Sequence, residues 1–164
     1  MIIRDARADE YPLVGELRVG AYQALGLLAE SDGYTETLRG FGFDGACAVL
    51  VACDEADGGI LGTITVEPFG PHSELARDKT EADVRAFAVS PVAQGRGVGR
   101  ELLAAAIEHA AKSGLLRLRL CTMPAMHAAQ RIYAAAGFSR TPELDFQPVP
   151  GLTLRAYSLS LLAV

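Results

Sequence analysis

One stretch of the sequence decides the fold: residues 84–103, which read VRAFAVSPVAQGRGVGRELL. The first part belongs to a strand that we predict over residues 81–89, ended by Ser90-Pro91. The last part opens the clearest helix of the chain, because apolar residues recur there at helical spacing: Val98, Leu102, Leu103, Ala106, Ile107 and Ala110. A glycine-rich loop therefore joins a strand directly to the start of a helix.

This loop has the chemistry of an anion site. The start of a helix presents unpaired backbone N–H groups and a partial positive charge. Glycines let a bulky phosphate approach that backbone closely. Arg96 and Arg100 add cationic side chains beside it. We therefore predict an anion site, with a pyrophosphate as the favoured ligand.

Spacing separates three phosphate-binding motifs. The sequence has no Gly-x-x-x-x-Gly-Lys-Ser/Thr string, so it has no P-loop. Gly95 and Gly97 fit the first half of a dinucleotide fingerprint, but Arg100 stands at its third glycine position. The pattern that fits is Gln-x-x-Gly-x-Gly, as Gln94, Gly97 and Gly99. Taken alone, the loop also fits a flexible turn before a helix.

The remaining elements predict a mixed α+β fold rather than a doubly wound one. Asp57-Gly58-Gly59 signals a hairpin, Asp9 is the expected helix cap, and residues 68–80 read as a long loop. We expect residues 142–151 to form a rim over a pocket. The expected strands are 2–5, 46–53, 60–66, 116–120, a short one from 138 and 152–161, and the expected further helices are 11–25, 34–39 and 125–136.

The composition of the chain excludes several classes of function. The chain has 164 residues, half of them hydrophobic, which suits one domain over residues 1–164 with a full core. The net charge of −5 and the absence of a basic stripe argue against nucleic acid. No signal peptide or membrane-length apolar run is visible, and the three cysteines form no CxxC pair. We expect a cytoplasmic protein with reduced thiols, no metal and no membrane partner.

Two motifs carry a resemblance to a known family. Residues 84–103 match the central motif of the GCN5-related N-acetyltransferases nearly throughout. Residues 128–138, AAQRIYAAAGF, are similar to the family's later helix, which carries a tyrosine and ends in Gly-Phe. The resemblance implies a mostly antiparallel central sheet of about seven strands, flanked by about four helices. It also implies acetyl-CoA as the donor substrate.

The resemblance assigns the donor site residue by residue. The backbone of Phe87 and Val89 would pair with the pantetheine arm, and an N–H near Val89 would polarise the thioester carbonyl. Met126 departs from the family, which often has an asparagine there that contacts the cofactor. The implied cofactor-binding residues are Phe87, Ala88, Val89, Gln94, Gly95, Arg96, Gly97, Val98, Gly99, Arg100 and Ala129.

Acetyl transfer needs a base and an acid. An alkylamine with a pKa of about 10 is only about one part in a thousand neutral near pH 7, so its proton must be removed. Asp83 is the first candidate base and Glu81, on the same face of the strand, the second; water or a solvated strand-end role is the alternative for both. Tyr133 matches the family's general acid, and a core tyrosine is the alternative reading.

The acceptor stays open at this point. By resemblance, the first two helices and the last hairpin build its pocket, and their acidic and aromatic residues suggest a bound cation: Tyr22, Glu30, Asp32, Tyr34, Phe41, Phe43, Phe146 and Tyr157. A small amine is the expected acceptor, with a protein N-terminus or lysine as alternatives. Two other functions fit the same donor site: transfer of a larger acyl group, and a non-catalytic CoA-binding sensor or interaction module. The sequence also allows a homodimer.

Overall fold

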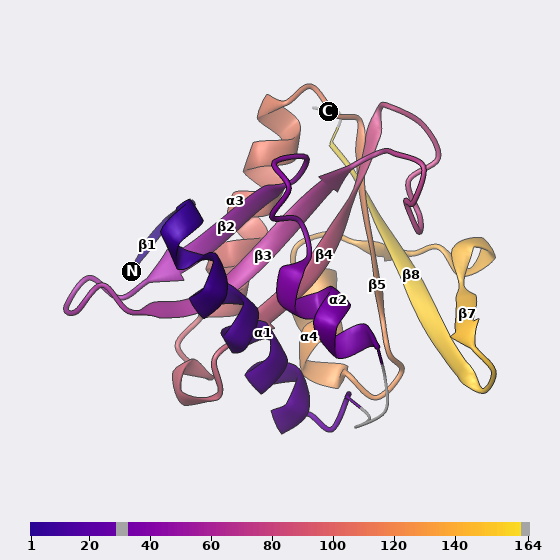
Figure 1. Ribbon diagram of the computed structural model, residues 1–164. Helices are drawn as coiled ribbons and strands as arrows, with labels where there is room; N and C mark the ends of the chain where they lie inside the picture. The colour runs from indigo at the N-terminus through magenta and orange to yellow at the C-terminus, as the bar shows by residue number, and fades with distance from the viewer. Residues whose placement is uncertain (29–32, 162–164) are drawn as a thin grey trace. The chain divides into compact units, whose positions relative to one another are not determined.

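A computed structural model describes residues 1–28 and 33–161 (Figure 1). The chain divides into two compact units, Met1–Val66 with Arg85–Ala106, and Glu67–Val84 with Ile107–Val164. Strand β4 (Glu81–Val89) and helix α3 (Val98–Lys112) each contribute residues to both units. That the chain is one domain stays a prediction.

The first unit is built on consecutive antiparallel strands. β1 (Ile2–Asp5) pairs with β2 (Ala48–Cys53), and β2 pairs with β3 (Ile60–Pro68). The predicted hairpin joins β2 to β3, and the Asp54 N–H donates to the Gly59 carbonyl across it at 2.8 Å. β4 is the next strand of the sheet, and the Ser90 N–H donates to the Leu61 carbonyl at 2.8 Å.

Different helices pack on the two faces of β3, because successive side chains of a strand point to opposite faces. Helices α1 (Tyr11–Ala24) and α2 (Tyr34–Gly40) run close together (Figure 1). Thr65 of β3 faces them, because its hydroxyl accepts a hydrogen bond from Arg18 on α1. Gly62, an odd number of residues away, faces α3 instead, as expected for a strand. The predicted apolar residues of α3 are buried, except that Ile107 is half-buried.

The absence of a side chain at Gly62 lets α3 approach the sheet. A Cβ there would lie 2.9 Å from the Ala88 carbonyl oxygen and 2.9 Å from a Leu102 methyl. We expect Gly62→Ala to lower the free energy of unfolding by roughly 1–3 kcal/mol, because a backbone atom cannot move aside. Chemical denaturation measures this. The matched control is Gly20→Ala on α1, where a Cβ meets nothing within 4 Å; it should stabilise the chain by about 0.5–1 kcal/mol.

The second unit contains a parallel pair of strands. Residues 81–83 of β4 pair with residues 117–119 of β5 (Arg117–Thr122), and β5 is antiparallel to β8 (Leu152–Ser160). β6 (Ser139–Arg140) and β7 (Phe146–Val149) also pair with β8. Helix α4 (His127–Ala135) follows β5 in the chain. The described residues thus form a mixed, mostly antiparallel α+β fold with four α-helices, which confirms the predicted fold class.

Two local predictions differ from the structure. The segment expected as a rim contains β7, so there are eight strands among the described residues rather than about seven. Two prolines argue against a strand here, yet Gly151, with φ of 85°, closes a hairpin onto β8. Asp9 does not cap α1 either: it lies in a 3-10 turn, and the helix starts after Glu10, with a proline in its first turn.

The described residues contain no helix long and apolar enough to cross a membrane. In the same part of the chain, no three histidine, cysteine or acidic side chains gather as metal ligands.

Candidate functional site

The glycine loop has a preformed backbone. Gly95 and Gly97 have φ of 81° and 78°, a conformation that residues with a Cβ rarely adopt. A Cβ at either position would meet nothing within 4 Å, so the loop faces open space. Gln94 ties the loop to the end of β4, because its Nε2 donates to the Val89 carbonyl at 3.2 Å. The glycines are therefore needed for backbone shape, with room left for a ligand.

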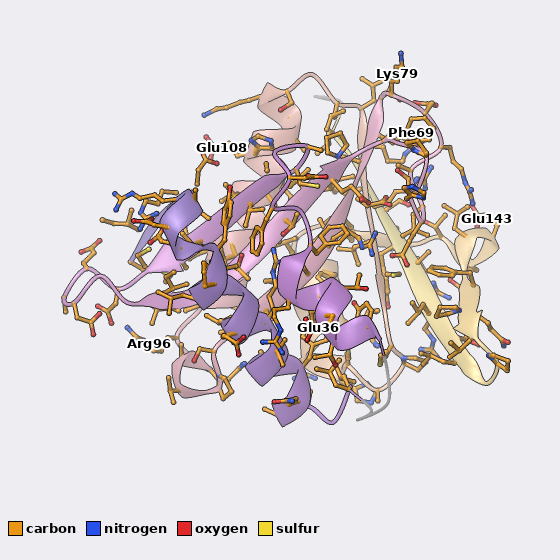
Figure 2. The ribbon with its side chains drawn as sticks, in the orientation of Figure 1. Glu36, Phe69, Lys79, Arg96, Glu108 and Glu143 are labelled. Atoms are coloured by element: carbon orange, nitrogen blue, oxygen red, sulfur yellow. The ribbon has the colours of Figure 1, made fainter. Side chains whose placement is uncertain are left out.

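Arg96, at the tip of the loop, is held by the β2–β3 hairpin (Figure 2). Its Nη2 lies 3.3 Å from Asp54 Oδ2, and the other carboxylate oxygen of Asp54 accepts the Ala56 N–H at 2.9 Å. These two hydrogen bonds, the backbone one first, lower the pKa of the Asp54 carboxyl. The sequence shows no sign of this pairing, because 42 residues separate the partners. Arg96 remains half-exposed, and the Arg100 side chain is exposed.

β4 carries a backbone irregularity just before the residues expected to pair with a ligand. Ala86 has φ of 49°, the positive value that an L-residue adopts only at some cost in free energy. Such a residue interrupts regular strand pairing and redirects the following peptide groups. Phe87 and Val89 are half-buried, whereas Ala88 is buried. The sequence gives no sign of this irregularity, since alanine is an ordinary strand residue.

Glu81 lies at the centre of a buried ion-pair network in the second unit. Arg119 binds its carboxylate in a bidentate manner, from Nε at 3.0 Å and from Nη2 at 2.9 Å. Arg117 Nη1 and the Arg77 N–H add bonds of 3.1 and 2.9 Å. Burial favours the neutral acid, but hydrogen bonds from Arg119 and the Arg77 backbone outweigh it and lower the pKa of Glu81. A carboxylate held in this way is a weak base.

Asp83 has a similar structural environment. Its two carboxylate oxygens accept the N–H groups of Leu75 and Ala76 at 3.0 and 2.9 Å, and its side chain is buried. Together with Glu81 it therefore satisfies three successive N–H groups of the loop before β4. Both carboxylates share one face of the strand, as predicted, but they are buried anchors rather than solvated strand-end groups. Their role as base stays a prediction.

Tyr133 lies on the inner face of α4. Only 4% of its side chain is exposed, and its ring centroid is 6.1 Å from those of both Phe138 and Tyr157. Burial raises the pKa of the Tyr133 hydroxyl, so it stays protonated throughout the neutral range. The helix ends as predicted: Gly137 has φ of 99°, and the Phe138 N–H donates to the Tyr133 carbonyl at 3.0 Å.

The start of α4 is arranged without the family's asparagine. Met126 is the residue before the helix and makes no capping hydrogen bond through its side chain. Gln130 fixes this turn instead, because its Nε2 donates to the Met123 and Pro124 carbonyls at 3.1 Å each. Ala129 is half-buried on the same helix. An open pocket of about 460 Å³ lies beside α4, lined in part by Arg131, Arg140 and Tyr157, and Tyr133 is not in its lining.

Two of the aromatic residues expected to hold a cation, Phe41 and Phe43, already have an arginine over their rings. The Arg18 guanidinium lies 4.6 Å from the Phe43 ring centroid, and that of Arg85 lies 4.5 Å from Phe41. Phe43 also stacks on Tyr11 at 4.2 Å. The sequence reasoning missed Arg18; its signal is a charged residue on the otherwise apolar face of α1. Glu30 and Asp32 lie outside the described residues.

Solved structures share this fold at low sequence identity. An acetyltransferase of the GNAT family from Staphylococcus aureus Mu50 is 17% identical, with 98% of this chain and 99% of that chain covered and a TM-score of 0.76. The protein yncA from Salmonella typhimurium, solved with its cofactor acetyl-CoA, is 20% identical over 100% and 95% of the two chains, with a TM-score of 0.71. A ribosomal-protein-alanine N-acetyltransferase from Brucella melitensis is 22% identical over 98% and 99%, also with a TM-score of 0.71.

The family follows from the sequence itself. No curated protein sequence matches the chain. A family model described as "Acetyltransferase (GNAT) family" matches residues 11–138, a span that contains the glycine loop, the irregular strand β4 and Tyr133. Both motifs singled out in the sequence therefore fall inside one family match, and the chain belongs to the GNAT acetyltransferase family.

Proposed function

We propose that this chain transfers the acetyl group of acetyl-CoA directly to a primary amine. The observation that carries the proposal is the loop of residues 94–99, with its two left-handed glycines, between β4 and the start of α3. Backbone N–H groups at a helix start suit a pyrophosphate, and the loop leaves open space for one. The yncA structure contains acetyl-CoA on the same fold, which supports this choice of donor.

The donor residues keep the roles assigned by resemblance. Amides of residues 94–99 hold the pyrophosphate, with Arg96 and Arg100 as nearby cations. The irregularity at Ala86 supports an added partner for the backbone of Phe87 and Val89, because a positive φ there redirects the peptide groups that follow. Ala88 and Ala129 line the bound donor. The N–H near Val89 polarises the thioester carbonyl.

The transfer requires two proton movements. The amine nitrogen attacks the carbonyl carbon as a base removes its proton, and the C–S bond breaks as the sulfur gains one. The Tyr133 hydroxyl donates the second proton in this proposal, a role that its buried, protonated state supports. Asp83 remains the first candidate for the base and Glu81 the second. Because both are engaged by N–H groups or arginines, they would act through an ordered water.

Thiol release from acetyl-CoA in the presence of an amine panel tests the function. The panel should hold amino acids, polyamines, aminoglycosides and a peptide with a free N-terminus, since one fold relative acts on a ribosomal-protein alanine. Release that depends on an amine supports the proposal. Faster release from propionyl- or succinyl-CoA would instead identify a transferase of larger acyl groups. Tight acetyl-CoA binding without release across the panel would identify a non-catalytic binder.

The backbone of Gly97 offers a sharper test of the donor site. We expect Gly97→Ala to weaken acetyl-CoA binding roughly 5–30-fold, because a left-handed alanine costs about 1–2 kcal/mol and the loop would change shape. Gly26→Ala is the control: φ there is 71°, the space is equally open, and the position lies outside the loop. It should lower stability without changing affinity. Equal affinities of the Gly97 variant and the wild type would argue against this loop as the pyrophosphate site.

We also propose a cytoplasmic location and a homodimeric arrangement. Gel filtration with light scattering measures the second directly.

A further inference from the structure

Arg18 is a wholly buried cation in the first unit. Its Nη1 donates to the carbonyls of Leu38 and Phe41 at 3.0 and 2.8 Å, and its Nη2 donates to Thr65 Oγ1 at 3.1 Å. The guanidinium also lies over the Phe43 ring. Arg18 therefore joins α1 to the end of α2, to the segment after it and to β3.

The charge of Arg18 has no carboxylate partner within the described residues. Its hydrogen-bond acceptors are neutral, and the titratable groups that act on it are Tyr22, Cys47 and Tyr34. Its Nε has no hydrogen-bond partner. Burial accordingly lowers the pKa of Arg18 to about 10, against a smaller opposing effect of Tyr22. A buried, unpaired cation costs stability, so its presence calls for an explanation.

The position of this charge relates it to the proposed donor strand. Arg18 binds the carbonyl of Phe41, and the ring of Phe41 carries the guanidinium of Arg85. Arg85 lies on β4, directly before Ala86 and two residues before Phe87. The buried cation is thus two contacts away from the strand along which we propose that acetyl-CoA binds.

Negative charges on the same two helices do not cancel this cation. Glu16 on α1 and Glu36 on α2 both pair with Arg39, and their side chains are 65% and 78% exposed. Water screens exposed charges, whereas a buried charge acts over a longer distance. Among the described residues of α1 and α2, no buried carboxylate therefore balances Arg18, which lies over the Phe43 ring and binds the Phe41 carbonyl. A second cation is unfavourable beside this charge, in contrast to the bound cation that the sequence suggested.

We infer that the acceptor is an amine that also carries an anionic group, as an amino acid does, and that Arg18 determines this specificity through its charge. The inference rests on the proposed acetyl transfer and narrows its acceptor. Arg18 is fully buried, so it acts at a distance rather than by contact. At an effective dielectric constant of about 20, a unit cation attracts an anion about 8 Å away strongly enough to raise the affinity for it by more than about tenfold.

A matched pair of acceptors tests the inference: an α-amino acid and its α-amino amide, compared across several side chains. The amide lacks the carboxylate charge, so its amine loses a proton more easily, and amine basicity alone would favour the amide. We expect kcat/KM to be at least about tenfold higher for the acid instead. Equal values, or a preference for the amide or for polyamines, would overturn the inference.

Variants at position 18 identify the source of the preference. Arg18→Lys keeps the charge and should keep the preference, whereas Arg18→Met should abolish it while leaving acetyl-CoA affinity unchanged. Arg39→Met removes a partly exposed arginine of the same helix pair and should leave the acid-to-amide ratio as it is. A purely structural role for Arg18 would lower thermal stability in both position-18 variants without changing the ratio.

A binding readout separates this inference from the proposed function. Thermal shift measurements of the CoA-bound protein, with acid and amide compared, need no turnover. If acids stabilise the wild type more than amides do while no thiol is released, the acceptor inference holds and the proposed transfer fails. If thiol is released with no preference in either readout, the transfer holds and the inference fails. If Arg18→Met does not fold, the wild-type acid-to-amide ratio still decides whether the acceptor carries an anionic group.

Discussion

Tyr133→Phe is expected to lower kcat roughly 10²–10⁴-fold while leaving acetyl-CoA affinity nearly unchanged. The substitution removes only the hydroxyl that we propose as the proton donor to the departing sulfur. The ring stays in place, since its contacts are with Phe138 and Tyr157. Steady-state kinetics of thiol release, with calorimetric titration of acetyl-CoA, measures both quantities.

Tyr157→Phe is the control for this substitution. Tyr157 is a buried tyrosine of β8 that packs against Tyr133, and no role in proton transfer is proposed for it. Its variant should keep kcat within a few-fold of the wild type. A Tyr133→Phe enzyme with unchanged kcat would refute the assignment and leave Tyr133 as a core residue.

Glu81→Gln is expected to lower the free energy of unfolding by about 3–5 kcal/mol, because it leaves the buried Arg119 without its counter-charge. Chemical denaturation of the variant measures the loss. The Glu108→Gln variant removes a carboxylate from an exposed i,i+4 pair with Lys112 and should have no measurable effect. If the two variants were equally stable, the network around Glu81 would not hold the second unit together.

The same network predicts how stability depends on pH. The pKa of Glu81 is lower in the folded than in the unfolded chain, so its stabilisation is complete above the unfolded value of about 4.5. It is lost as pH falls through the lower, folded pKa. Denaturation at pH 7 and at pH 3 should show a smaller difference between wild type and Glu81→Gln at the acid pH. A difference that grew on acidification would contradict the predicted direction.

Periodicity predicted most of the framework correctly. The apolar face of α3 and the end of α4 at Gly137 follow from local patterns of 3.6 residues and from the backbone freedom of glycine. β7 was missed because Pro148 and Pro150 argue against a strand, and only pairing with β8 makes one. Local sequence does not encode such a partner.

The donor loop was found because its chemistry is local: a strand end, glycines and a helix start lie within about 20 consecutive residues. The contacts of the buried charged groups, in contrast, come from residues far away in the sequence. Glu81 pairs with Arg119, which lies 38 residues further along the chain, and Arg18 donates to Thr65, which lies 47 residues further along. Sequence reasoning therefore treated Glu81 and Asp83 as free groups and Phe43 as a free ring, whereas tertiary contacts occupy all three.

Calorimetric titration with acetyl-CoA, compared with S-acetylpantetheine, tests the central claim most directly. The two ligands share the thioester and the pantetheine arm, but only acetyl-CoA carries the pyrophosphate assigned to residues 94–99. We predict that acetyl-CoA binds and that S-acetylpantetheine binds far more weakly. We also predict that Gly97→Ala reduces the difference in affinity between the two ligands. Equal affinity for the two ligands, or no binding of acetyl-CoA at millimolar concentration, would contradict the account.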